Sequence, residues 1–224
     1  MRPLALFDLD DTLCDRADAF ARWVRGFSAE HQVDDGGSAY LLDIDESGLR
    51  PRSQFFAMAR ERLGLTPTVA ELTEAYTPAY VAGYRCDPAV RDALAGLRSA
   101  GWAVGIVTNG APSQLDKITG TGLDRIVDGW AISEVEEVAK PNPEIFRRAA
   151  RACGEQLGVD TWMVGDNPVA DIGGAVLTGL RSVWIDLGRA WEQPAFKPDH
   201  TCDGPLAAIE LIAAGGPSSG TRGV

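Results

Sequence analysis

Five short apolar runs recur along the chain, and each is followed by a polar or glycine-containing turn. Runs of this length without polar alternation are typical of strands that are buried on both faces of a parallel sheet. The pattern predicts strands over residues 3–8, 102–107, 126–132, 161–164 and 181–185.

Helical spacing of apolar residues fills the segments between and after the later strands. Asp87 followed by Pro88 is a typical helix start, because Asp caps the first turn and Pro suits its first position. The spacing predicts helices over residues 88–99, 112–120, 143–153, 168–178 and 205–214. Strands that alternate with helices predict an α/β fold, a Rossmann-like parallel sheet with helices on both faces.

The segment between the first two strands has a different pattern and no convincing strand. Amphipathic helices are predicted over 15–31, 52–63 and 68–83, and residues 32–50 are predicted to be a loop with about one helical turn. We therefore expect a core made of residues 1–13 and 87–214, with a helical insert over 14–86. The Gly/Ser-rich tail, 215–224, is predicted to be disordered.

The first predicted strand ends in a cluster of carboxylates. Leu4 to Phe7 is apolar, and Asp8, Asp10 and Asp11 follow within four residues. Like charges so close together disfavour one another's ionisation, and a divalent cation relieves that repulsion. Hard cations such as Mg²⁺ prefer oxygen ligands, so the cluster predicts a magnesium site rather than a plain surface turn after an edge strand.

Polar residues at the ends of two other strands indicate the same candidate site. Thr108 ends the second strand and Asp166 follows the fourth. Ligands of open α/β sheets bind beyond the carboxyl ends of the strands. We therefore expect Asp8, Asp10, Thr108 and Asp166 to gather at one edge of the sheet.

With these residues in place, the chain resembles the phosphatase type of the haloacid dehalogenase (HAD) superfamily. Four motifs follow one another in the family's order: Asp8-Leu9-Asp10-Asp11-Thr12, Thr108-Asn109, Lys140-Pro141, and Gly165-Asp166 with Asp171 five residues later. The resemblance covers residues 4 to about 186. It implies that the helical insert is a mobile cap.

The resemblance also implies roles for the acidic residues. Asp8 would be the nucleophile that forms an aspartyl-phosphate, and Asp10 would exchange protons with the leaving group and the attacking water. Mg²⁺ would be held by the carboxylates of Asp8 and Asp166 and by the main-chain carbonyl of Asp10.

The remaining motif residues would bind the phosphoryl group. The Thr108 hydroxyl and backbone N–H groups, including that of Asn109, would hold phosphoryl oxygens. Lys140 would neutralise charge on the phosphoryl group and on Asp8. Asp171 would orient Lys140 or a metal-bound water.

Charge and composition limit the partners. A net charge of −11 repels phosphate backbones and anionic membranes, so we expect neither nucleic acid nor membrane binding. No apolar stretch approaches the roughly 20 residues of a membrane span. Four scattered cysteines predict reduced thiols in a cytoplasmic protein. The expected partner is a small-molecule phosphate ester, and the chain could be a monomer or a homodimer.

Several alternatives differ from a phosphatase at particular residues. A haloalkanoate dehalogenase has Tyr where this chain has Asp10, and a phosphonate-cleaving relative needs a lysine in its cap, whereas residues 1–116 contain none. A sugar-phosphate mutase shares every motif and stays open. From other classes, a receiver-like phosphoacceptor domain and a catalytically silent binding module also remain.

Overall fold

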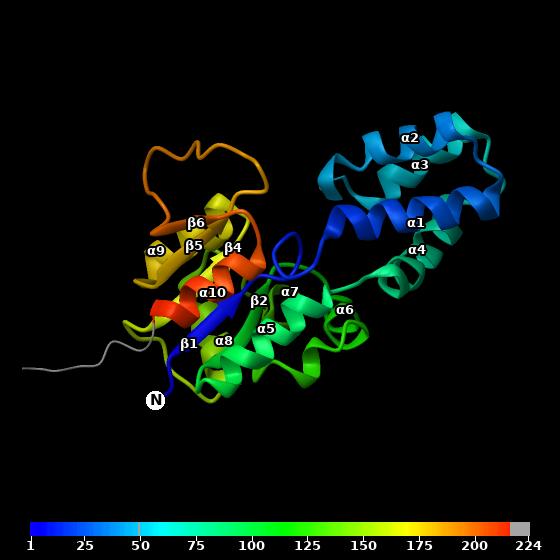
Figure 1. Cartoon of the computed structure of the whole chain (residues 1–224). Coiled ribbons are helices and arrows are strands. Elements are labelled where there is room, and N and C mark those ends of the chain that lie inside the picture. The colour runs from blue at the N-terminus through cyan, green and yellow to red at the C-terminus, as the bar shows by residue number, and fades with distance from the viewer. Residues whose placement is uncertain (49, 216–224) are drawn as a thin grey trace, which may run out of the picture. The chain divides into compact units, whose positions relative to one another are not determined.

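The computed structural model describes residues 1–48 and 50–215, so the tail that the sequence predicts to be disordered lies outside the described residues except for Gly215. Contacts divide the chain into two compact units. One consists of Met1–Cys14 together with the chain from Cys86 onward, and the other is Asp15–Arg85. The first contains the sheet and the second is helical (Figure 1).

A parallel sheet of six strands in the order β3-β2-β1-β4-β5-β6 forms the centre of the first unit (Figure 1). The strands are β1 (Leu4–Phe7), β2 (Ala103–Thr108), β3 (Gly129–Ile132), β4 (Thr161–Gly165), β5 (Arg181–Ile185) and β6 (His200–Cys202). Every residue of β1, β2 and β4 is buried, as the continuous apolar runs predict. The predicted α/β fold with a Rossmann-like core is confirmed.

Two details of the sheet differ from the prediction. The strand predicted over 126–132 begins only at Gly129, because a turn precedes it in which the Ile126 N–H donates to Leu123 O at 2.9 Å. The edge strand β6 is not predicted at all, since its three residues are polar or half-exposed and form no apolar run.

Helices cover the sheet in two contacting pairs. Helix α5 (Pro88–Ser99) contacts α10 (Pro205–Gly215), and α8 (Pro143–Ala152) contacts α9 (Gly174–Thr178). Under α8, the apolar side chains of Phe146, Leu6 and Val107 belong to one buried core cluster. The shorter helical segments are α6 (Gln114–Gly120), η2 (Leu123–Arg125), α7 (Ser133–Glu136) and η3 (Pro168–Gly173).

The helix predicted over 168–178 has two parts. Residues Pro168–Gly173 form a π-helical turn, η3, and α9 continues as an α-helix. Asn167 caps this turn, because its side-chain oxygen accepts from the N–H groups of Val169 and Ala170. The wider turn contains Asp171, which becomes important at the site.

The second unit consists of α1 (Arg16–His31), α2 (Asp35–Ile44), η1 (Glu46–Gly48), α3 (Arg52–Leu63) and α4 (Val69–Gly83). The predicted loop over 32–50 is wrong, because α2 occupies most of it. Asp34 caps the first turn by accepting from the Gly37 N–H at 2.7 Å. A side chain on Gly37 would meet Val33 at 2.4 Å and Leu63 at 2.9 Å, so close packing explains the glycine that obscures the helical pattern.

A buried ion cluster joins three elements of this unit. Asp45, which follows α2, is 2 % exposed and pairs with Arg16 at 2.9 Å and with Arg52 at 2.7 Å. The Arg52 guanidinium also lies 4.7 Å from the centre of the Tyr76 ring. Both arginines therefore have structural partners inside the helical unit.

No helix among residues 1–48 and 50–215 combines the length and the apolar character needed to cross a membrane.

Candidate active site

The three central strands carry the acidic and hydroxyl residues to one edge of the sheet. Asp8 follows β1, Thr108 ends β2 and Asp166 follows β4, and β1 lies between β2 and β4. The Asp8 N–H continues the ladder by donating to Val164 O at 2.9 Å. Parallel pairing therefore fixes where Asp8 leaves the sheet.

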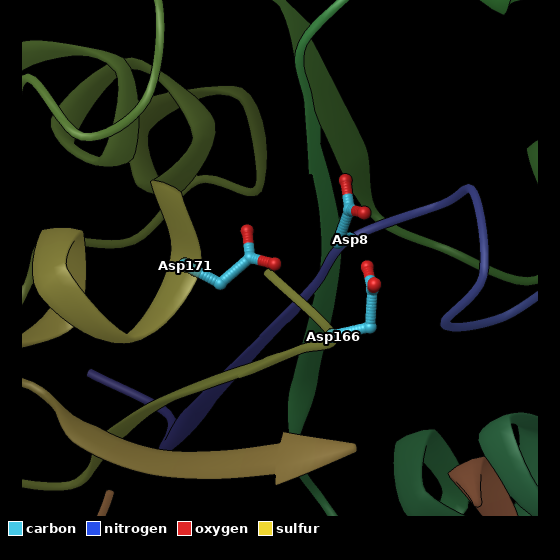
Figure 2. Close-up of side chains that lie close together, drawn as sticks. All are labelled: Asp8, Asp166 and Asp171. Atoms are coloured by element: carbon cyan, nitrogen blue, oxygen red, sulfur yellow. The ribbon is translucent and has the colours of Figure 1, made fainter. Parts of the chain in front are cut away.

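Three carboxylates meet at this edge. Asp8, Asp166 and Asp171 each offer an oxygen, and these oxygens lie within 4.8 Å of one another. Figure 2 shows the three side chains gathered where the chain leaves β1 and β4. Burial raises the pKa of Asp8 from 3.8 to about 7, although the ammonium of Lys140 acts in the opposite direction. Burial and the charge of Asp171 raise the pKa of Asp166 to about 6.

Lys140 supplies the positive charge inside this cluster. Its ammonium donates to Asp8 Oδ1 at 2.6 Å and to Asp171 Oδ1 at 2.7 Å, and its side chain is buried. Burial lowers the pKa of Lys140, but the charges and hydrogen bonds of Asp171 and Asp8 outweigh it and raise that pKa above its ordinary value. Lys140 is therefore a fixed ammonium at neutral pH.

Asn109 holds the main chain at Lys140. Its side-chain amide donates to Lys140 O at 3.0 Å, and its oxygen accepts from the Lys140 N–H at 2.8 Å. The Asn109 side chain thus positions the lysine, and the expected contact of its backbone N–H with phosphate stays a prediction.

Asp171 is held between two donors. One oxygen accepts from Lys140 and the other accepts from the Asn167 N–H at 2.9 Å. Its position depends on Gly165, because a Cβ atom there would lie 2.2 Å from Asp171 Cγ. Asp171 therefore contacts Lys140 directly, and its role in orienting Lys140 or a metal-bound water stays a prediction.

Asp10 lies in a second group of contacts that the sequence analysis did not include. Lys117 Nζ lies 2.9 Å from both of its carboxylate oxygens, and Gln114 Nε2 donates to Asp10 Oδ2 at 2.9 Å and to Thr108 Oγ1 at 2.8 Å. The available signal is weak: Gln114 and Lys117 are three residues apart on one short helix, and lysine is rare in this chain. The Asp10 main-chain carbonyl as a metal ligand stays a prediction.

Arg189 also contacts the site, although it lies outside the four motifs. Its guanidinium donates to Asp166 Oδ2 at 3.1 Å and to Asp166 O at 2.8 Å. It belongs to the segment after β5, between the strand predicted over 181–185 and the helix predicted over 205–214. Arg189 therefore contacts both the main chain and the carboxylate of Asp166.

The donor set fits a hard divalent cation. All three clustered side chains offer carboxylate oxygens, which Mg²⁺ prefers. Three carboxylates against the ammonium of Lys140 and the guanidinium of Arg189 leave a formal charge of −1 when all are ionised. Burial, with the charge of Asp171 added to it, raises the pKa values of Asp8 and Asp166, so both carboxyls retain protons more strongly than usual when no cation is present.

Comparison with known proteins agrees with this geometry. Residues 3–177 match the family model of haloacid dehalogenase-like hydrolases. A phosphoserine phosphatase of Thermus thermophilus is 38% identical over 150 residues, which cover 66% of this chain and 59% of that protein. A glyceraldehyde 3-phosphate phosphatase of Pyrococcus abyssi is 33% identical over 200 residues, which cover 84% of this chain and 83% of that protein.

A solved structure shares the whole fold. The magnesium-bound crystal structure of the HAD-hydrolase YfnB from Bacillus subtilis superposes with a TM-score of 0.78 at 22% identity. The match covers 94% of this chain and 98% of that one. At this identity the likeness concerns the fold, whereas the family model spans most of the chain and all four motif regions. The chain therefore belongs to the haloacid dehalogenase-like hydrolases and is an enzyme of their phosphatase type.

Proposed function

We propose that this enzyme is a Mg²⁺-dependent phosphomonoester hydrolase that acts on a small phosphorylated metabolite through an aspartyl-phosphate on Asp8. The observation that carries the proposal is the buried contact of Asp8 with Lys140 at 2.6 Å inside a three-carboxylate cluster. A carboxylate in this setting is fixed in place and lies beside positive charge, as a nucleophile toward phosphorus requires.

The proposed reaction has two steps, and in both of them Asp10 moves the proton. Asp8 attacks phosphorus, the bond to the ester oxygen breaks, and that oxygen takes a proton from Asp10. Water then attacks the aspartyl-phosphate while Asp10 accepts a proton from it, which releases phosphate and regenerates Asp8.

Lys140 and Thr108 are placed to bind the phosphoryl oxygens. An ammonium has three N–H donors, and among the described residues its bonds to Asp8 and Asp171 account for two, so one can reach a phosphoryl oxygen. The Thr108 hydroxyl accepts from Gln114, so its own proton can be donated to the phosphoryl group. Backbone N–H groups such as that of Asn109 complete this proposed site.

Magnesium would be held by the carboxylates of Asp8 and Asp166 and by the main-chain carbonyl of Asp10. When bound, it would supply the positive charge that offsets repulsion between a phosphate dianion and the carboxylates.

The helical unit fits a cap that limits substrate size. We propose that residues 14–86 cover the site during the reaction and that the hinges lie near 13–16 and 83–88. The ends of the helical unit, Asp15 and Arg85, fall within these hinge segments. The names of the two relatives, phosphoserine phosphatase and glyceraldehyde 3-phosphate phosphatase, favour a small phosphorylated metabolite as substrate.

The test is phosphate release from a panel of phosphorylated metabolites with Mg²⁺. Asp8→Asn removes the nucleophile and should lower turnover by at least ~10³-fold while the fold stays intact. Asp92→Asn is the matched control, because Asp92 is exposed on α5 and should keep wild-type activity. Chelation of Mg²⁺ should silence the wild-type enzyme. Appreciable turnover by the Asp8 variant, or unchanged activity in chelator, would refute the mechanism.

The same panel separates the alternatives that share these residues. A mutase would convert the ester into an isomer with little free phosphate. A receiver-like phosphoacceptor would keep its acyl phosphate for minutes instead of turning over steadily. Continuous release of inorganic phosphate supports the hydrolase.

A further inference from the structure

Helix α6 carries two buried polar side chains that face the site from outside the four motifs. Gln114 is 3 % exposed and Lys117 is 8 % exposed. Long polar side chains are rarely buried to this extent unless they are paired. Both are paired here with Asp10, which is more than a hundred residues away in sequence.

The contacts fix both carboxylate oxygens of Asp10. Lys117 Nζ lies 2.9 Å from Oδ1 and 2.9 Å from Oδ2, and Gln114 donates to Oδ2 at 2.9 Å. A carboxylate can only accept, so the amide nitrogen of Gln114 must be the atom that faces it. Charge-assisted bonds of this kind restrict rotation of the carboxylate about its side-chain bonds.

Gln114 also joins Asp10 to the phosphate-binding side of the site. The same amide nitrogen donates to Thr108 Oγ1 at 2.8 Å. One amide group therefore sets the spacing between the proposed proton donor and a proposed phosphate-binding hydroxyl. This spacing matters because the leaving oxygen is bonded directly to the phosphorus that Thr108 helps to hold.

The absence of a side chain at Gly110 leaves room for Gln114. Gly110 has a φ of +156°, and a Cβ atom there would lie 2.9 Å from Gln114 Cγ. A side chain at Gly110 would therefore require Gln114 or the backbone beside it to shift.

We propose that Lys117 and Gln114 are positioning residues that hold the carboxyl group of Asp10, which carries a proton before the ester bond breaks, for proton transfer to the leaving oxygen. The inference rests on the proposed function and deepens it. It assigns to α6 a task that the motif residues do not perform, because the described contacts of Lys140 and Asp171 are with other carboxylates and main-chain groups.

The test varies how strongly the leaving group needs a proton. Esters of similar size are 4-nitrophenyl, phenyl and benzyl phosphate, whose leaving groups become steadily worse in that order. The measured quantity is kcat/KM with Mg²⁺, since it covers the steps up to departure of the leaving group and is independent of later hydrolysis of the intermediate.

Lys117→Met keeps the length of the side chain and removes its charge. We expect kcat/KM for benzyl phosphate to fall at least about tenfold more than for 4-nitrophenyl phosphate, because general acid catalysis contributes about 10²–10⁴-fold where the leaving group needs it. Lys197→Met is the matched control, since Lys197 is exposed and should leave all three rates unchanged.

Gln114→Leu is the second variant and should change the same ratio in the same direction. Losses common to all three esters, such as partial unfolding or weaker phosphate binding, cancel in the ratio. An equal loss for the three esters, no loss, or a selective gain for benzyl phosphate would overturn the positioning role. The proposed function itself fails by a different result, which is wild-type protein that releases no phosphate from any ester in Mg²⁺.

Discussion

A methyl group at position 165 should displace Asp171 and loosen the centre of the site. In the present structure, a Cβ atom on Gly165 would lie 2.2 Å from both Cγ and Oδ2 of Asp171, whereas real Cβ atoms essentially never approach other atoms closer than 3.0 Å. Asp171 must therefore retreat by about 1 Å, since interiors are packed too tightly to absorb the overlap elsewhere. A shift of that size stretches its 2.7 Å bond to Lys140 beyond hydrogen-bond range.

The energetic cost has two parts. Overpacking of a well-packed site costs about 1–3 kcal/mol. Loss of one charged partner from a buried ammonium costs about 3–5 kcal/mol when the pair is broken completely. Lys140 keeps Asp8 as a partner, so only part of the cost of losing a charged partner applies. Gly165→Ala should therefore lower the free energy of unfolding by about 3 kcal/mol.

Denaturant unfolding measures this change, and Gly96→Ala provides the contrast. Gly96 is exposed in α5 and has no atom near the position of an added Cβ. The same methyl group should therefore stabilise the protein there by about 0.5–1 kcal/mol, through helix propensity. If Gly165→Ala stays within about 0.5 kcal/mol of wild type, Asp171 is not held as the structure implies, and its role in orienting Lys140 must be abandoned.

Two further predictions concern the cation and the helical unit. Without cation, stability should fall as pH rises from about 4 to about 7, because raised pKa values let folded Asp8 and Asp166 keep protons that the unfolded chain releases. Mg²⁺ should raise Tm more at about pH 8 than at about pH 5.5, since it must displace those protons; equal shifts would contradict this. Asp45→Asn should cost about 3 kcal/mol in denaturant unfolding because two arginines lose their buried counter-charge. The exposed Asp43→Asn should change stability by less than about 0.5 kcal/mol, and equal effects of the two variants would argue against the ion cluster.

The sequence predicts the sheet well because the central strands are buried on both faces. Each central strand is a continuous apolar run that ends at a polar residue, so strand ends and site residues can be read together. The apolar pattern fails to predict an element where only one face of that element is buried, or where tertiary packing outweighs the helix propensity of its residues. Helix α2 contains Gly36 and Gly37, which are poor helix formers, and close packing against Leu63 is what requires one of them.

The gathering of Asp8, Thr108 and Asp166 could be predicted because these residues lie at or just after strand ends, whereas Lys140 and Asp171 are expected only from the resemblance to the family's motifs. Lys117, Gln114 and Arg189 could not be predicted, because their contacts depend on how far a long side chain reaches from an element whose orientation the sequence does not give. Lys117 and Asp10 are 107 residues apart, and nothing in the local pattern of α6 distinguishes a lysine that faces the site from one that faces solvent.

Lysine is rare in this chain, and two of its three lysines contact carboxylates of the site. The chain has 21 Lys and Arg residues, and its only lysines are Lys117, Lys140 and Lys197. The first two bond to site carboxylates, and the third is exposed. A guanidinium is planar and suits side-by-side pairing with one carboxylate, whereas an ammonium is a compact charge that can be shared between separate acceptors. Lys140 uses this property to bond both Asp8 and Asp171 through its single ammonium.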